Sequence, residues 1–500
     1  MKNGKKKDPE VIIVGTGFAG LAMGIQLKKA GISNFVILER ADSAGGTWRD
    51  NDYPGCACDI PSMLYSFSFE PNGNWTRAYP TQPEIRDYLQ NVAKKYKLEP
   101  HIRYDSEIAE ADYDEPNQRW HVRTTAGDTY TGRFLVSGMG GLSNPSTPVL
   151  PGIESFPGKS FHSATWDYSV PLDGKDVAVI GTGASAIQFV PQIAPRVGKL
   201  SLFQRTPPWI APKLDYQVSA LQQTLRRYMP GYSWALRKLI YWLLEVRAIG
   251  FQGNRTMLAF MESISRGHLQ RQIADPILRS KVMPEYQFGC KRVLISNDYY
   301  PALLRPNVDV VTSGVSHVDG EYIVTSDGVR HHADVIVYGT GFRAQDPISP
   351  VNIVGANGVS IADAWRDGME AFYGISIAGF PNFFMLVGPN TGLGHNSMVL
   401  MIEAQVRYVI NAIKYLRKQK GGAIDVKRDV QDAFNEQLQG RLGATVWNGG
   451  CKSWYLDASG KNTTLWPGFT FAYRRETKKL EPDRYQVHEA PNKRKVTAIR

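Results

Sequence analysis

Cysteine is scarce in this sequence, which limits both covalent cross-linking and metal binding. The 500 residues include four cysteines, Cys56, Cys58, Cys290 and Cys451. This number is too small for a disulfide scaffold. Cys56 and Cys58 also lack the matching second pair that would complete a zinc site. We therefore expect these two thiols to be packed in the interior, and the protein to be cytoplasmic.

Long apolar runs are also missing. No run reaches the roughly 18 residues that span a bilayer, and residues 1–8 lack the apolar region of a signal peptide, so we expect no stable membrane insertion. The net charge is +11. However, much of the basic excess lies near the ends, as in Lys493-Arg494-Lys495, and forms no stripe within a nucleic-acid-binding fold. We therefore expect no nucleic acid as partner.

The sequence does contain two glycine-rich turns, each between a short apolar run and a helix-like run. The first follows Val11–Val14 and reads Gly15-Thr-Gly17-Phe-Ala-Gly20. Its glycines allow a tight turn and close approach of the backbone to a pyrophosphate, and the helix N-terminus favours that anion. The next strand, residues 35–38, ends at Glu39, where an acid can accept hydrogen bonds from a ribose diol. This order predicts a dinucleotide-binding unit.

The second turn repeats the arrangement with one difference. It follows Val177–Ile180, reads Gly181-Thr-Gly183-Ala-Ser-Ala186, and is followed by a strand at residues 200–203. Arg205 then stands at the position that Glu39 holds in the first unit. A 2′-phosphate repels a carboxylate and pairs with a guanidinium, so the pattern favours NADP(H), although a solvated charge at a strand end is the alternative.

Two longer patterns carry a resemblance to a known family. Residues 156–167 read F-x-G-x3-H-x3-W-D, which is similar at every specified position to the signature of type I Baeyer–Villiger monooxygenases. Residues 45–59 read G-G-x-W-x4-Y-P-G-x3-D and resemble a second pattern of that family. Related N- and S-oxygenating flavin monooxygenases usually have Tyr or Phe at the position of Trp166 and lack the following Asp. Disulphide reductases need a redox cysteine pair, which is missing.

The patterns and the resemblance together predict an α/β fold. It would have two Rossmann-like dinucleotide-binding domains, one for FAD and one for NADP, with a helical insertion in the second. The FAD-binding domain is expected at 1–150 and 343–473, and the NADP-binding domain, with its linker, at 151–214 and 284–342. The insertion is expected at 215–283, and a weakly ordered basic tail at 474–500. Within the insertion, we expect 239–244 to pack on the second unit, with a membrane-facing or substrate-lining surface as the alternative.

The resemblance also implies site residues. Arg292 is expected to be the active-site cation, and Asp59 the acid that orients it. FAD is expected to contact Gly15, Gly17, Gly20, Glu39, Gly46, Thr47, Trp48, Asp59, Tyr65, Ile108 and Met398. NADP is expected to contact Gly181, Thr182, Gly183, Ala184, Ser185, Gln188, Arg205, Thr206, Lys291, Arg292 and Trp454. We assign His162 and Trp166 to coupling of the two sites; His395 has no identifiable acid partner and receives no role.

The implied activity is the NADPH- and O2-dependent insertion of oxygen next to a ketone carbonyl, giving an ester or lactone through a C4a-peroxyflavin. An unprotonated peroxide needs a permanent cation, and arginine does not deprotonate in proteins. Two alternatives stay open. One is an N- or S-oxygenating flavin-containing monooxygenase that acts through the hydroperoxyflavin. The other is a non-catalytic flavin-binding or membrane-surface protein that uses the cationic ends and the region of Trp242.

Overall fold

The computed structural model describes residues 8–345, 348, 350–419 and 421–491. Its first sheet has five parallel strands in the order β19-β7-β1-β2-β3. These are β19 (Phe383–Met385), β7 (Phe134–Ser137), β1 (Val11–Val14), β2 (Phe35–Leu38) and β3 (Ile102–Arg103). Every residue of β1 and β2 is buried, as expected of a parallel sheet covered on both faces.

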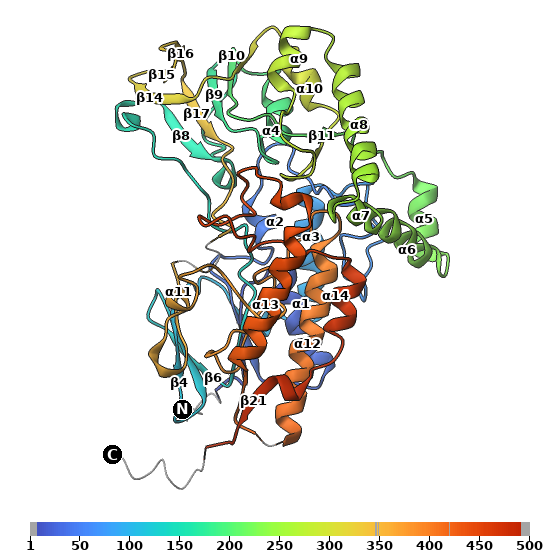
Figure 1. Cartoon of the computed structure of the whole chain (residues 1–500), viewed down its shortest axis with the longest axis vertical. Coiled ribbons are helices and arrows are strands. Elements are labelled where there is room, and N and C mark those ends of the chain that lie inside the picture. Colours follow the sequence, from blue (N-terminus) through green and yellow to red (C-terminus); the bar gives the residue numbers. More distant parts are fainter. Residues whose placement is uncertain (1–7, 346–347, 349, 420, 492–500) are drawn as a thin grey trace.

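Helices from both ends of the sequence cover this sheet. They are α1 (Phe18–Lys29) and α12 (Met398–Gln419), which lie side by side in the lower half of the molecule (Figure 1). Their apolar residues share one core with β1 and β2. Because β19 and α12 follow the second unit in sequence, the chain returns to complete the first unit.

The second sheet is also parallel and lies at the upper end of the molecule (Figure 1). Its order is β13-β10-β9-β17-β8. The strands are β13 (Val308–Val311), β10 (Lys199–Phe203), β9 (Asp176–Ile180), β17 (Val335–Tyr338) and β8 (Lys159–His162). Helices α4 (Ala186–Ile193) and α10 (Tyr299–Leu303) pack beside it and share its core. The prediction of an α/β fold with two Rossmann-type units is confirmed.

Smaller elements complete the two units. An antiparallel group joins β4 (Ile108–Asp114), β5 (Arg119–Thr124) and β6 (Thr129–Gly132), with β18 (Asn352–Val354) parallel to β4. A second group joins β14 (Val315–Asp319), β15 (Tyr322–Thr325) and β16 (Arg330–His332), and a short pair joins β11 (Ile210–Ala211) to β12 (Leu294–Ile295). The first unit also contains the helices α2 (Thr47–Asp50), α3 (Gln82–Lys95), α11 (Ile361–Ala364) and α13 (Arg428–Gly443).

The insertion is helical, but its expected packing is wrong. It contains α5 (Ala220–Tyr228), α6 (Tyr232–Glu245), α7 (Arg247–Phe251), α8 (Arg255–Gln272) and α9 (Pro276–Val282). Tyr241 and Leu244 join the core of the first unit, not the second, and contact with the second core begins near Leu269. The sequence did not reveal this because α6 is apolar on more than one face. Within the described residues, no helix is long and apolar enough to cross a membrane.

The prediction of a weakly ordered tail is wrong for residues 474–491. Helix α14 (Thr470–Glu476) packs on α12, and β21 (Tyr485–His488) pairs antiparallel with β20 (Ala423–Val426). Tyr485 is buried and its hydroxyl lies 2.9 Å from that of Tyr408. Buried tyrosines therefore outweigh the polar composition of this segment. The rest of the expected tail, 492–500, lies outside the described residues.

Candidate active site

The first glycine turn connects β1 to α1 through a backbone that only glycine fits. Gly15 has φ +93°, and a Cβ there would lie 2.8 Å from the carbonyl oxygen of Gly138. A Cβ on Gly20 would lie 1.8 Å from the carbonyl oxygen of Gly15. The N-cap residue of α1, Gly17, has no side chain that could cap the helix amides. The turn therefore leaves helix amides available to a pyrophosphate.

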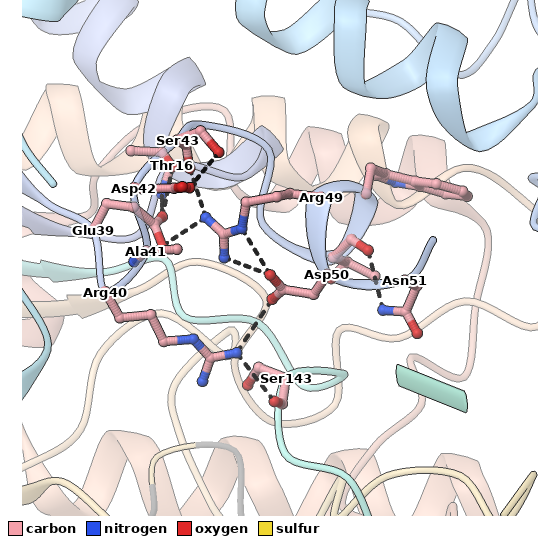
Figure 2. A network of polar contacts seen from close by, with 12 residues as sticks. Thr16, Glu39, Arg40, Ala41, Asp42, Ser43, Arg49, Asp50, Asn51 and Ser143 are labelled. Atoms are coloured by element: carbon pink, nitrogen blue, oxygen red, sulfur yellow. Dashed lines mark hydrogen bonds and ion pairs between the residues drawn. The ribbon is translucent and has the colours of Figure 1, made fainter. Parts of the chain in front are cut away.

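Glu39 lies at the end of β2 inside a polar network (Figure 2). Its carboxylate accepts hydrogen bonds from the Thr16 amide at 2.8 Å and the Ala41 amide at 3.1 Å, and Arg49 Nη1 lies 2.9 Å away. Arg49 also contacts Asp50 at 2.6 Å. Burial lowers the pKa of Arg49, but Glu39 and Asp50 offset this and raise it. The sequence analysis missed Arg49, which occupies an unspecified position between Trp48 and Tyr53 of the second pattern.

The wall next to this network is aromatic. Trp48 Nε1 donates a hydrogen bond to the Tyr65 hydroxyl at 3.0 Å, and the Phe18 ring packs edge-on against Tyr65 with centroids 5.1 Å apart. Gly46, with φ +53°, precedes Thr47 at the start of α2, and a Cβ there would lie 2.9 Å from Cα of Gly17. The structure thus brings Gly17, Gly46, Thr47, Trp48 and Tyr65 together. A flat ring could lie against this wall.

Two further residues expected at the first site lie on different elements. Ile108 begins β4 and is buried in a core that includes Trp120. Met398 begins α12 and packs against the first core. Among the described residues, the polar contacts of Glu39 come from Thr16, Ala41 and Arg49 and from neither of these two residues.

The second glycine turn repeats the geometry of the first. Gly181 has φ +105°, and a Cβ there would lie 2.5 Å from the carbonyl oxygen of Gly339. The Thr182 hydroxyl donates to the Thr206 carbonyl at 3.3 Å, which ties the turn to the end of β10. The following residues Gly183 and Ala184 are exposed, and Ser185 is partly exposed. A nucleotide could therefore reach this turn from solvent.

Two basic residues near this turn have no acidic partner within the described part of the chain. Arg205 is exposed beyond β10, and Lys291 Nζ lies 4.8 Å from the centroid of the Tyr286 ring. Burial and the charge of Arg205 lower the pKa of Lys291. Among the described residues, neither cation forms an ion pair. Like charges brought together without a counter-ion are typical of an anion site.

Gln188 of α4 joins the two units. Its side-chain oxygen accepts from the Tyr53 hydroxyl at 3.0 Å, and its amide donates to the Ala57 carbonyl at 2.9 Å. Gly55 has φ +80°, and a Cβ there would lie 2.7 Å from the Gln188 carbonyl oxygen. The sequence analysis expected Gln188 at NADP; the structure places its side chain against the first unit.

Arg292 and Asp59 meet where the units join. Arg292 Nη2 lies 2.5 Å and Nε 3.1 Å from Asp59 Oδ2. Their side chains are 30% and 32% exposed, so a ligand can reach both. The Asp59 carboxylate raises the pKa of Arg292, against burial, which lowers it. The cation is therefore permanent and held in place.

Tyr455 lies behind this pair and was missed as a site residue. Its side chain is buried, and burial raises the pKa of the phenol to about 12, although the charge of Arg292 opposes that shift. The neighbouring Trp454 is 41% exposed, and its carbonyl accepts from Gln345 at 2.7 Å. The stretch Ser453-Trp454-Tyr455 resembles a loop of the family that closes over NADP, and Trp454 is the residue of this loop that was predicted to contact NADP.

A disulfide links the two segments that carry these residues. Cys290 precedes Lys291, Cys451 lies three residues before Trp454, and the two half-cystines have Cα atoms 6.3 Å apart. The other two cysteines are free and buried, as expected. Four cysteines are too few for a disulfide framework, as predicted, but this single bond was not predicted. Its two cysteines lie 161 positions apart in sequence and so form no local pattern.

The signature at 156–167 is packed into the second unit. A Cβ on Gly158 would lie 2.1 Å from the Asp334 carbonyl oxygen, so glycine lets β8 approach β17. His162 Nδ1 accepts from the Ala164 amide at 3.0 Å. The Trp166 ring packs on Phe189, with centroids 5.3 Å apart. These contacts are structural, and the coupling role of His162 and Trp166 stays a prediction.

His395 has an acid partner that the sequence did not reveal. Its ring nitrogen Nε2 lies 3.6 Å from Glu245 of α6, and both side chains are 1% exposed. Glu245 also accepts from Asn396 at 2.6 Å and from the Thr470 amide at 2.5 Å. This cluster ties the insertion to the loop before α12 and to α14.

Two glycine-turn units, joined across a cation–carboxylate pair, define a class of two-domain nucleotide-dependent oxidoreductases. Residues 12–233 match the family described as pyridine nucleotide-disulphide oxidoreductase. No Cys-x-x-Cys sequence is present, so the match reflects the shared nucleotide-binding plan.

More specific relatives narrow this class. A Baeyer–Villiger monooxygenase of Streptomyces coelicolor is 48% identical over 479 residues, covering 95% of this chain and 92% of the relative. Cyclohexanone monooxygenase from Rhodococcus sp. Phi1 bound to NADP+ is 29% identical, with a TM-score of 0.86 and coverage of 96% and 99%. The structure of OTEMO in complex with FAD and NADP is 27% identical, with a TM-score of 0.86 and coverage of 96% and 100%. The chain belongs to the Baeyer–Villiger monooxygenase family.

Proposed function

We propose that this protein is an NADPH- and O2-dependent flavoprotein monooxygenase that converts a ketone into an ester or lactone. The observation that carries the proposal is the Arg292–Asp59 pair, a fixed and accessible cation placed where the two nucleotide units join. Family membership supports the reaction class. A cytoplasmic location stays a prediction.

FAD fits the first unit. The tight turn at Gly15 and Gly20 offers backbone amides to a pyrophosphate, and Glu39 offers a carboxylate to a ribose. Arg49 and the Ala41 amide hold one Glu39 oxygen and Thr16 holds the other, so the carboxylate is oriented before any ligand arrives. Trp48 and Tyr65 would flank the ring.

NADP fits the second unit. The turn at Gly181 would hold the pyrophosphate, and Arg205 with Lys291 would pair with the 2′-phosphate through charge-assisted hydrogen bonds. Burial lowers the pKa of Lys291 most, and the charge of Arg205 lowers it further; bound phosphate would relieve this repulsion between the two cations. Trp454 would lie over this nucleotide from its loop.

When bound and reduced, FAD would supply the chemistry that activates O2, so that one of its oxygen atoms attacks the ketone carbonyl. Arg292 would stabilise negative charge on that oxygen and on the adduct, because it keeps its own proton. A fixed donor of this kind lowers the activation free energy by on the order of 3 kcal/mol. Asp59 would hold the guanidinium through two hydrogen bonds to one carboxylate oxygen.

A panel of cyclic and aryl ketones tests the proposal. The FAD-loaded protein is incubated with NADPH and 18O2, and each product is analysed by mass spectrometry. We expect an ester or lactone that contains one labelled oxygen atom. Sulfoxide from a sulfide, with no ester from any ketone, would favour an N- or S-oxygenating enzyme instead. Absence of NADPH-dependent flavin bleaching would exclude both.

A further inference from the structure

The insertion exposes a large share of the apolar surface. About half of the large apolar side chains exposed in the described chain lie between residues 221 and 264. Helices α5 and α6 project beyond the rest of the molecule (Figure 1). Exposed apolar clusters of this kind mark sites of interaction.

Helix α6 is apolar on two opposite sides. Its inner side buries Tyr241 and Leu244, which are 6% and 4% exposed. On its outer side, Leu239 and Leu243 are 58% and 61% exposed, and Trp242 between the two sides is 52% exposed. A helix with apolar residues on opposite sides is normally covered on both sides, by the rest of the protein or by a partner. We call Leu239, Trp242 and Leu243 the outer face of α6.

Positive charge predominates in the insertion that carries this outer face. Residues 216–272 contain eight Arg or Lys and two Glu. Glu245 is turned inward at 1% exposure, and Glu262 is paired with Arg266 at 2.7 Å. Among the described residues, the exposed cations Arg227 and Lys238 have no ion-pair partner, and Lys238 Nζ lies 5.8 Å from the Trp234 ring centroid.

The combination points to one kind of partner, and we propose that the outer face of α6 docks reversibly on an anionic lipid surface. Tryptophan and leucine would enter the boundary between headgroups and acyl chains, while Arg227 and Lys238 pair with lipid phosphates. No described helix can span the bilayer, so attachment would be peripheral. This binding does not depend on the proposed catalytic activity.

The charge near the outer face of α6 favours a lipid surface over a second copy of this chain as its partner. A symmetric dimer through this face would place the same patch against itself. Cations of one copy would then lie close to those of the other, with no exposed unpaired glutamate between 216 and 272 to offset them. An anionic bilayer complements both the apolar residues and the cations.

Vesicle sedimentation of the full-length holoenzyme tests the proposal. One set of vesicles contains phosphatidylcholine and phosphatidylglycerol in equal parts, and the other contains phosphatidylcholine alone. We expect binding to the anionic set that weakens as salt is added, because salt screens exposed charges. The double variant Arg227→Glu/Lys238→Glu should lower the partition coefficient by about tenfold or more. Trp242→Gln/Leu243→Gln should lower it as well.

Ile277→Gln/Val329→Gln is the matched control. These residues are 69% and 49% exposed and lie outside the outer face. Binding should match the parent, and circular dichroism should be unchanged in all variants. The proposal is overturned if the parent ignores anionic vesicles or if both α6 variants bind as well as the parent. It is also overturned if light scattering shows a dimer that the α6 variants convert to monomer.

Discussion

The two nucleotide units share a backbone plan but treat the residue at the strand end in opposite ways. In the first unit, Glu39 is buried and its oxygens are already engaged by Thr16, Ala41 and Arg49. In the second, Arg205 and Lys291 have no acid partner among the described residues. A carboxylate that several donors hold in place is oriented before a ligand binds, whereas a pair of unpartnered cations gains free energy when an anion arrives. The difference indicates a resident nucleotide in the first unit and an exchanging one in the second.

The strongest test of the comparison is the residue at the junction of the units. Arg292→Ala should lower ester formation by about 10²–10³-fold, because it removes the fixed charge that stabilises the reacting oxygen. Product formation is measured by gas chromatography at matched flavin content. Arg305→Ala, which removes an exposed cation of the second unit, serves as control. Ester formation at the parental rate would remove Arg292 from the mechanism.

A smaller effect is expected from the unpartnered cations. Arg205→Ala and Lys291→Ala should each lower kcat/KM for NADPH by about 10–100-fold, since each removes a charge-assisted hydrogen bond to phosphate. The value for NADH should stay unchanged, which is measured by following nicotinamide absorbance. Arg196→Ala, at an ion pair elsewhere in this unit, should leave both values intact. Equal losses with NADPH and NADH would contradict the assignment.

A smaller effect still is expected from a substitution in the hydrogen-bond network around Glu39. Arg49→Met leaves Glu39 with its amide and hydroxyl donors, so we expect FAD affinity to fall by about tenfold, the worth of one charged hydrogen bond. Affinity is measured by titrating the apoprotein with FAD and following flavin fluorescence. Arg40→Met, at a position 42% exposed, is the control. If the Arg49→Met and Arg40→Met variants bind FAD with equal affinity, orientation of Glu39 by Arg49 does not contribute to FAD binding.

The disulfide is expected to have the smallest effect on turnover. The denatured, unreduced protein should show two reactive thiols, from Cys56 and Cys58, and four after reduction. Reduction should leave initial turnover unchanged but hasten thermal inactivation, because the bond closes a long loop. Cys451→Ser should behave as the reduced protein does. Four thiols before reduction would show that the bond does not form.

Local patterns predicted most of the scaffold. Strands such as β1 and β9 consist largely of consecutive buried residues, and glycines follow them directly, so the signal lies within about 20 residues. The position of Arg205 against Glu39 came from the same local register. The Arg292–Asp59 pair came from the family resemblance, since the two residues lie 233 positions apart.

What the sequence determined by itself is the two-unit plan, because strand, turn and helix depend on neighbours along the chain. Tertiary structure alone decided the Glu245–His395 contact, the Arg49–Glu39 pair and the disulfide between Cys290 and Cys451. It also decided which side of α6 is buried. Such contacts depend on how separate elements pack, and a charge or an apolar residue gives no indication along the chain of the distant group it will meet.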